Sequence, residues 1–365
     1  MCPLALALKQ RPEFESLVCV TAQHREMLDS VLATFALTPD YDLNIMEAGQ
    51  TPSSITARVL EQLGPVLREA RPDIVLVHGD TTTAFAAALA AFYEKIPVGH
   101  VEAGLRTFDR YSPYPEEMNR CLVGRIAEYH FAPTARNREN LLREAVAGQI
   151  FVTGNTVIDA MRYTVDERPF ATEILNRLDF SGKKVILVTC HRRENYGQPM
   201  EDIMSALAHI ARTHPEVELV YPVHLSPVVQ EHAHRHLDNM ENVHLIPPLE
   251  VQEMHKLMAR CYLVMTDSGG LQEEAPALGK PVLVLRRETE RPEAVAAGTV
   301  KLAGVAFDDI VALANTLLDD PAAYERMARA VNPYGDGQAC RRIVDALAWG
   351  FHLRAQAPEE FSPNK

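Results

Sequence analysis

Acidic side chains follow two buried strands in the first half of the chain. The apolar run at residues 74–77 leads through His-Gly into Asp80, and the run Val98–Val101 ends directly at Glu102. The carboxyl ends of parallel strands face one crevice of an α/β sheet, so we expect the carboxylates of Asp80 and Glu102 there. Glu116 comes soon after Glu102 in the sequence and is expected at the same crevice. Crowded carboxylates between low-dielectric walls have pKa values that move apart, which provides a proton acceptor and a proton donor.

Each of these carboxylates also has a purely structural interpretation. Asp80 could be the N-cap of the helix that follows it. Glu116 and Glu117, next to Pro115, form a common arrangement for the first turn of a helix. The convergence of three acidic positions on one crevice favours acid/base chemistry over capping alone.

Basic side chains occupy the corresponding positions in the second half. His191 and Arg192 follow one apolar run, His224 follows the next, and Arg291 lies in a cation-rich segment after a further run. A diphosphate would find charge-assisted hydrogen-bond partners among them. The alternative for the arginines is a solvated loop.

A glycine turn after the apolar run Leu263–Thr266 is the strongest single motif. Ser268, Gly269 and Gly270 open a helix whose first amides have no internal partner, which suits a phosphate. Glu274, one turn into that helix, could accept hydrogen bonds from ribose hydroxyls. The same pattern also occurs as a tight packing turn without a ligand.

Several other classes of site lack support. The sequence contains neither G-x-G-x-x-G nor a P-loop motif, so we expect no dinucleotide cofactor and no other cofactor. The six cysteines are scattered without a C-x-x-C pair, which argues against a zinc site or a disulfide framework. His232 and His236 share a helix face, but the sequence suggests no third ligand, so we expect no metal.

Apolar runs alternate with helical patterns along the whole chain, which is the rhythm of a parallel α/β fold. The expected strands are residues 17–21, 74–77, 98–101, 129–132, 185–189, 219–223, 243–246, 263–266 and 282–285. The rhythm changes near residue 158, which predicts domains at 1–158 and 159–337. A helix at 338–352 is expected to join the first domain, and a disordered tail is expected at 355–365.

Composition and charge limit the classes of partner that the chain is expected to bind. The chain has 365 residues and a net charge of −13, which disfavours nucleic acid and anionic membranes as partners. The longest apolar run, residues 84–93, is too short to span a bilayer, and the first residues lack the basic leader of a signal peptide. We therefore expect a cytoplasmic protein.

Taken together, eight blocks of residues closely resemble the non-hydrolysing UDP-N-acetylglucosamine 2-epimerases, in order and over nearly the whole chain. The blocks are residues 78–83 (HGDTTT), 100–106 (HVEAGLR), 115–120 (PEEMNR), 153–156 (TGNT), 191–194 (HRRE), 222–224 (PVH), 266–274 (TDSGGLQEE) and 289–293 (TERPE). The resemblance implies a GT-B architecture, with two Rossmann-like domains around a central cleft and usually a homodimer.

The resemblance also implies roles for individual residues. The acid/base carboxylates would be Asp80, Glu102 and Glu116, and His224 would contact the diphosphate side of the substrate. The implied substrate-binding residues are Arg120, His191, Arg192, Ser268, Gly269, Gly270, Glu274 and Arg291. Some bacterial members bind a second UDP-N-acetylglucosamine as an activator, in a region that corresponds to Gln23, His24, Glu26 and Arg58.

The implied reaction is reversible epimerisation of UDP-N-acetylglucosamine at C2, through elimination of UDP to 2-acetamidoglucal and re-addition. Alternatives are a hydrolysing relative, a GT-B glycosyltransferase, or a UDP-sugar-binding protein of low or no activity. The last is motivated by a departure from the family: its members begin with a strand and a Gly-Thr-Arg-Pro-Glu loop, about fifteen residues that this sequence lacks, which would leave two unpaired sheet edges. We attribute that departure to a mis-assigned start or a truncation; if it is real, we expect instability or reduced turnover.

Overall fold

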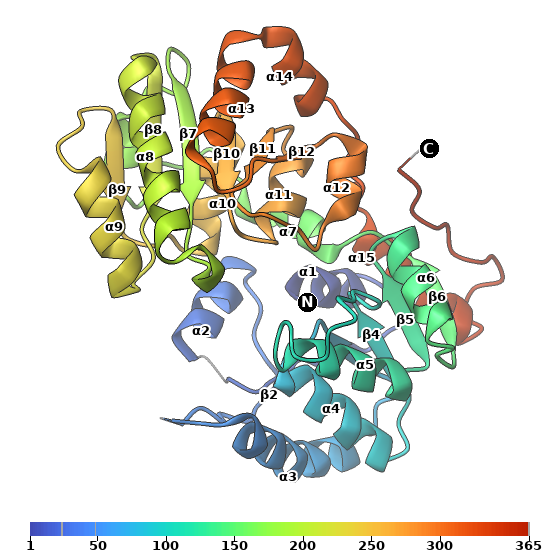
Figure 1. The fold of residues 1–365 in the computed structure, drawn as a ribbon. Coiled ribbons are helices and arrows are strands. Elements are labelled where there is room, and N and C mark those ends of the chain that lie inside the picture. Colours follow the sequence, from blue (N-terminus) through green and yellow to red (C-terminus); the bar gives the residue numbers. More distant parts are fainter. Residues whose placement is uncertain (23–24, 48, 364–365) are drawn as a thin grey trace. The chain divides into compact units, whose positions relative to one another are not determined.

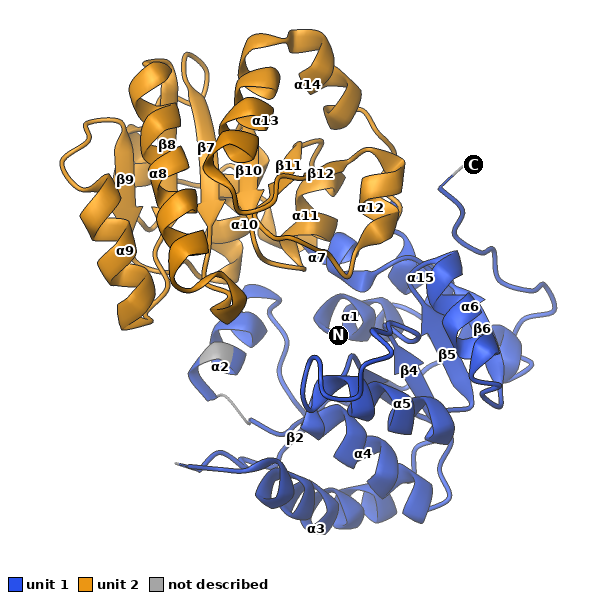
Figure 2. Cartoon of the chain, viewed as in Figure 1, with its two compact units in different colours: residues 1–160, 334–365 blue, residues 161–333 orange. Residues whose placement is uncertain are grey.

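The computed structural model describes residues 1–22, 25–47 and 49–363. It divides into two compact units, blue and orange in Figure 2. Unit 1 comprises Met1–Ala160 and Tyr334–Lys365, and unit 2 comprises Met161–Pro333. Within the described ranges, no helix has the length and apolar character needed to cross a membrane.

Unit 2 is built on a six-stranded parallel sheet (Figure 1). Its strands are β7 (Lys184–Thr189), β8 (Val217–Pro222), β9 (Val243–Ile246), β10 (Leu263–Thr266), β11 (Val282–Val284) and β12 (Val300–Leu302). The order β12-β11-β10-β7-β8-β9 runs outward in both directions from the pair β7 and β10. This pair is the topological switch point, so segments that follow β7, β8 and β10 meet at one edge of the sheet.

Helices cover both faces of this sheet, as its nearly continuous apolar strands require. They are α8 (Gln198–Thr213), α9 (Pro227–Leu237), α10 (Val251–Arg260), α11 (Leu271–Ala277), α12 (Pro292–Ala297), α13 (Phe307–Asp319) and α14 (Pro321–Ala328), with 3-10 turns at Glu173–Arg177 and Arg193–Asn195. Helix α7 (Thr156–Thr164) carries the chain from unit 1 into unit 2.

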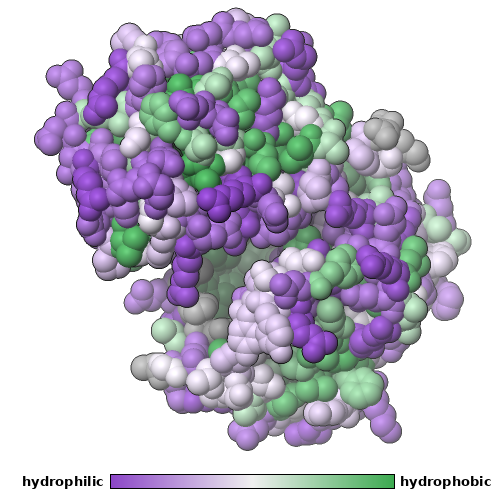
Figure 3. Space-filling view, viewed as in Figure 1, coloured by the Kyte–Doolittle hydropathy of each residue, from purple (hydrophilic) through white to green (hydrophobic). Residues whose placement is uncertain are grey.

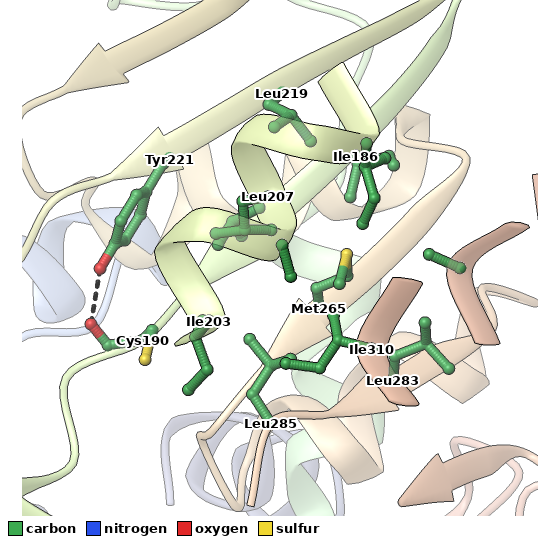
Figure 4. Close-up of a cluster of buried hydrophobic side chains, with 14 of the residues drawn as sticks. Ile186, Cys190, Ile203, Leu207, Leu219, Tyr221, Met265, Leu283, Leu285 and Ile310 are labelled. Carbon is green, nitrogen blue, oxygen red and sulfur yellow. Dashed lines mark hydrogen bonds between the residues drawn. The ribbon is translucent and has the colours of Figure 1, made fainter. Parts of the chain in front are cut away.

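The largest core of the molecule lies in unit 2 (Figure 4). Ile203 and Leu207 of α8 belong to one buried cluster with residues of β7, β8, β10 and β11. Tyr221, at the end of this cluster, donates its hydroxyl to the carbonyl oxygen of Cys190 at 2.6 Å. Burial raises the pKa of the Tyr221 phenol, so the group stays neutral and its polar tip is satisfied inside the core.

The strands of unit 1 form two parallel sheets rather than one. They are β1 (Cys19–Val20), β2 (Tyr41–Asp42), β3 (Val75–His78), β4 (Val98–Val101), β5 (Tyr129–Ala132) and β6 (Gln149–Val152). One sheet is β1-β2 and the other is β3-β4-β5-β6, so within the described residues β1 and β3 each pair on one side only. The strands β2, β6 and β12 were not predicted, and each lies at a sheet edge.

The helices of unit 1 include one from the far end of the sequence. They are α1 (Cys2–Lys9), α2 (Arg25–Thr34), α3 (Pro52–Ala70), α4 (Thr82–Tyr93), α5 (Glu116–Ile126), α6 (Ala135–Arg143) and α15 (Ala339–Gly350). Ile343 and Leu347 of α15 share a buried cluster with Leu4 of α1. The carboxylate of Asp159 accepts the amides of Ala339 and Cys340 at 3.0 and 2.9 Å, which satisfies the start of α15.

The C-terminal segment makes specific contacts with unit 1, whereas the sequence analysis expects a disordered tail. Phe361 is buried, and its amide donates to the carbonyl oxygen of Val152 at 2.8 Å. The guanidinium of Arg342 lies over its ring, 5.4 Å from the centroid. A single aromatic side chain thus anchors a segment whose Pro- and Glu-rich composition indicates disorder.

Two residues of unit 1 position the loops that follow β3 and β4. Gly104 has φ +90°, and a Cβ atom there would lie 2.2 Å from the carbonyl oxygen of Asn137. His100 is fully buried in β4, and its Nε2 donates to the carbonyl oxygen of Gly79 at 2.8 Å. Burial lowers the pKa of His100 to about 3, and its buried Nδ1 has no hydrogen-bond partner among the described residues.

Gly104→Ala should destabilise unit 1 strongly. The left-handed backbone costs an alanine about 1 kcal/mol, and overlap with Asn137 adds about 1–3 kcal/mol. The matched control is Gly49→Ala: Gly49 has φ +71° but no described atom within 4 Å of its Cβ position. Urea denaturation of both variants measures the difference, and equal losses of unfolding free energy would contradict the packing argument.

His100 should make the stability of unit 1 depend on pH. The unfolded chain binds a proton near pH 6.5 and the folded chain only near pH 3, so stability is present above pH 6.5 and falls with pH below it. Between pH 7 and pH 5, His100 should lower the unfolding free energy of the wild type by about 2 kcal/mol. His100→Gln should not show this loss, and its side-chain amide can still donate to Gly79. Denaturation at both pH values checks it; an unchanged pH dependence would refute the assignment.

Candidate active site

Asp80 follows β3 and is held by a cation. Its Oδ2 lies 2.8 Å from Nε and 2.6 Å from Nη2 of Arg120, and its carbonyl oxygen accepts the Asn119 amide at 2.8 Å. The N-cap of α4 is Thr81, whose side chain accepts the Ala84 amide, so Asp80 is not used as the cap. The Asp80 side chain keeps 27% of its surface exposed, which leaves it available for a ligand.

Glu102 directly follows β4 in a strained conformation. Its φ is +63°, in the left-handed region that a non-glycine residue adopts only at a cost. Its Oε2 lies 3.3 Å from Nε2 of His78. The surrounding protein desolvates His78 and lowers its pKa well below the usual value, although 32% of the side chain is exposed, so Glu102 faces a neutral imidazole. Strain at a carboxylate beside a histidine is characteristic of a functional position.

Glu116 and Glu117 begin α5 but have different environments. Glu117 is buried, accepts the amides of Thr107 and Phe108, and binds Nη1 of Arg120 at 3.0 Å. Its hydrogen bonds are thus taken up by the fold. Oε2 of Glu116 is buried and has no hydrogen-bond partner within the part of the chain that the structure describes. A buried carboxylate oxygen without a partner is costly, which makes Glu116 a candidate to meet a substrate.

The loops that follow β7 and β10 in unit 2 are organised by a carboxylate that was not among the predicted site residues. Asp267 follows β10, is fully buried, and accepts the amides of His191 and Arg192, both at 2.7 Å. It also accepts the side-chain amide of Asn195 at 3.2 Å. These bonds join the loop after β10 to the loop after β7.

Two histidines stack at this edge of the sheet. The rings of His191 and His224 lie 5.3 Å apart at 12°, and Nδ1 of His224 accepts the Ser226 amide at 3.0 Å. Burial lowers the pKa of His191. The carboxylate of Asp267, 3.3 Å from its Nδ1, acts in the opposite direction but does not reverse this shift. His191 is thus a neutral hydrogen-bonding group.

Two guanidinium groups flank the glycine turn that precedes α11. A Cβ atom on Gly269 would lie 3.8 Å from Nη2 of Arg192 and 3.9 Å from Nη2 of Arg291. The sequence predicts that the amide of Ser268 is free to bind a phosphate. In the structure this amide donates to Oγ1 of Thr266 at 2.9 Å. Gly269, Gly270 and the two arginines remain suited to an anion.

The acidic pair in α11 also divides into two environments. Glu273 is buried and pairs with Nε of Arg291, which fixes the arginine beside the turn. Glu274, the predicted ribose contact, lies with Oε2 3.4 Å from Nε2 of His255. The buried His255 is in turn 2.7 Å from the hydroxyl of Thr164, so Glu274 is oriented by a short chain of polar groups.

The predicted activator residues are only partly described. Gln23 and His24 lie outside the described residues. Glu26 is exposed in the first turn of α2. Arg58 in α3 donates to the carbonyl oxygen of Ile45 at 3.0 Å and pairs with Glu47. The activator site at these residues stays a prediction.

Sequence reasoning missed His78, Glu117 and Asp267 as parts of the site. All three lie in motifs that it quoted, and Asp267 has the same signal as Asp80, an acidic residue directly after a buried strand. The roles differ because of neighbours that are distant in sequence.

Comparison with known proteins shows which family the chain resembles. The family model described as UDP-N-acetylglucosamine 2-epimerase matches residues 6–348. The UDP-N-acetylglucosamine 2-epimerase of Bacillus subtilis is 54% identical over 363 residues, covering 99% of this chain and 95% of that protein. The enzyme of that name from Escherichia coli K12 is 57% identical over 354 residues, covering 95% and 94%.

A solved structure is similar throughout. The crystal structure of the Neisseria meningitidis UDP-GlcNAc 2-epimerase bound to UDP-GlcNAc is 48% identical, has a TM-score of 0.87, and is covered to 96%, as is this chain. The predicted α/β fold class, with two parallel-sheet units, is confirmed. With its carboxylates after β3 and β4 and its basic glycine turn after β10, the chain belongs to the UDP-N-acetylglucosamine 2-epimerase family.

Proposed function

We propose that the protein is a UDP-N-acetylglucosamine 2-epimerase that interconverts UDP-N-acetylglucosamine and UDP-N-acetylmannosamine. Full-length identity to epimerases of known name supports the activity. The observation that carries the chemistry is the carboxylate of Glu116, which has a buried oxygen without a hydrogen-bond partner in the described chain and begins a helix in the unit that also holds Asp80 and Glu102. No cofactor is part of the proposal.

Proton removal at C2 needs prior or concerted departure of UDP. The C2 proton of the sugar has no carbonyl neighbour, so a carboxylate alone is far too weak a base to remove it. When the C1–O bond breaks, its electron pair leaves with UDP, and the cation-like ring acidifies that proton. Its loss gives 2-acetamidoglucal. Re-addition of UDP at C1, with protonation of C2 on the opposite face, completes epimerisation.

Unit 1 holds three carboxylates that suit these proton transfers. Arg120 fixes the orientation of Asp80 by two short contacts. Glu102 is held by strained backbone, with its Oε2 3.3 Å from Nε2 of His78. Glu116 has an oxygen ready to exchange a proton with the sugar. Two faces of C2 must be served, so more than one carboxylate is required.

The basic groups of unit 2 suit the leaving diphosphate. Arg192 and Arg291 provide charge at the glycine turn, and the stacked rings of His191 and His224 lie at the same edge of the sheet. Charge that develops on UDP would be stabilised by groups already in place. Glu274 is the proposed ribose contact.

The proposal extends to partners and location. A homodimer, a cytoplasmic location and a second UDP-N-acetylglucosamine acting as an activator near Glu26 and Arg58 follow from the family resemblance. The Methanocaldococcus jannaschii UDP-GlcNAc 2-epimerase, 32% identical to this chain, has been solved in complex with UDP-GlcNAc and UDP.

Proton NMR of UDP-N-acetylglucosamine in deuterated water tests the reaction. We expect UDP-N-acetylmannosamine with deuterium at C2, and a rate reduced about 10²- to 10⁴-fold in Glu116→Gln and Asp80→Asn. Glu69→Gln, an exposed carboxylate of α3, is the control and should retain activity. Free N-acetylmannosamine would instead identify a hydrolysing enzyme, and an unchanged spectrum from folded protein would refute the epimerase.

UDP titration by calorimetry separates binding from catalysis. Arg192→Gln should weaken UDP binding about 10- to 100-fold, because one charge-assisted hydrogen bond to phosphate is lost. Arg193→Gln, which removes the adjacent exposed arginine, should bind as the wild type does. Equal affinities for all three proteins would show that the glycine turn is not the diphosphate site. UDP binding with no turnover would favour a UDP-sugar-binding protein.

A further inference from the structure

A cluster of metal-ligating side chains joins α8 to α9 in unit 2. Glu201 lies in the first turn of α8, and His232 and His236 lie one turn apart on α9. One ligand atom from each residue can be chosen so that all three lie within 4.8 Å of one another. The third ligand is not apparent from the sequence around the histidine pair, because Glu201 comes from another helix. Figure 1 shows the two helices side by side on the sheet.

The geometry of His232 points to a missing partner. Its Nδ1 lies 2.9 Å from Oε1 of Glu201. Even so, this buried nitrogen has no hydrogen-bond partner among the described residues, because close approach alone does not align the two atoms. Nε2 of His236 contacts the other oxygen, Oε2, of the same carboxylate. In a tetrahedral zinc site, ligand atoms about 2.0–2.1 Å from the metal lie about 3.3 Å from each other, so the side chains would close in from a spread of up to 4.8 Å.

The surroundings orient one ligand and include one competitor. The hydroxyl of Ser205 lies 3.4 Å from Nδ1 of His236, on the side of the ring opposite to Nε2, as an outer partner of a metal-bound imidazole does. Arg235 competes, since its Nη1 lies 2.7 Å from Oε1 of Glu201. Arg235 is half exposed and also contacts Glu231, so it has a second carboxylate to which it can move.

We propose that Glu201, His232 and His236 form a divalent-cation site of the zinc class, with water completing the coordination. Two imidazoles and a carboxylate are a ligand set that zinc accepts, and they leave a position open. The site would clamp α8 to α9. These helices begin shortly after the loops that carry Arg192 and His224, so the clamp would steady both loops without contacting a substrate. The visible face of this region is mostly hydrophilic (Figure 3).

Calorimetric titration of zinc chloride into chelator-treated, tag-free protein tests the site. We expect one site per chain that weakens at least about tenfold in Glu201→Gln and in His236→Asn, because loss of a ligand costs no less than loss of an outer partner. The matched control is His234→Asn on the same helix: His234 is exposed and pairs with Asp238 instead. Its zinc affinity should equal that of the wild type.

Two results would overturn the proposal. One is equal zinc affinity in the wild type, Glu201→Gln and His236→Asn, which would place any bound zinc elsewhere, for example at the exposed Cys19. The other is the absence of zinc binding by the wild type, which would leave the cluster as an ion-pair network. A cooperative urea unfolding transition like that of the wild type shows that each variant is folded. If a variant does not fold, anomalous diffraction from zinc-soaked wild-type crystals decides, through the presence or absence of a peak between the three side chains.

Discussion

The buried carboxylate of Asp267 is the constraint on which the loops after β7 and β10 of unit 2 depend. A fully buried charge is costly unless hydrogen bonds replace the water that it loses. Here Oδ2 accepts from the backbone of His191 and Arg192 and from the side chain of Asn195, all on the loop after the neighbouring strand, while the buried Oδ1 has no hydrogen-bond partner among the described residues. The solvation of one side chain therefore determines the path of a loop, and that path brings Arg192 to the glycine turn.

Unit 1 uses the same device with a different outcome. Buried Glu117 is satisfied by two backbone amides and by Arg120, and Arg120 in turn extends to Asp80. These hydrogen bonds offset the cost of burying Glu117. The remaining N–H groups of Arg120 bind the partly exposed carboxylate of Asp80. Glu116, one residue earlier, receives no such support for its buried oxygen. Adjacent residues of one type thus serve structure and chemistry separately.

Much of this could be predicted because it depends on local pattern. Strand ends are visible in sequence as apolar runs that stop, so Asp80, Glu102, His191 and His224 were placed correctly after β3, β4, β7 and β8. Roles that depend on distant neighbours could not be predicted in this way. The amide of Ser268 is occupied by a threonine hydroxyl that the turn motif does not reveal. Glu201 likewise meets its histidines only through helix packing, and edge strands such as β12 carry too few apolar residues to be recognised.

The return of α15 to unit 1 makes that unit discontinuous in the chain, with all of unit 2 inserted between its two parts. During synthesis the first part of unit 1 leaves the ribosome earliest, yet Asp159 must wait for Ala339 and Cys340, and Leu4 must wait for Ile343 and Leu347. Unit 2, which is continuous, has its whole core available sooner. Unit 1 therefore cannot complete its core until almost the whole chain has been synthesised, although its first residues are made earliest.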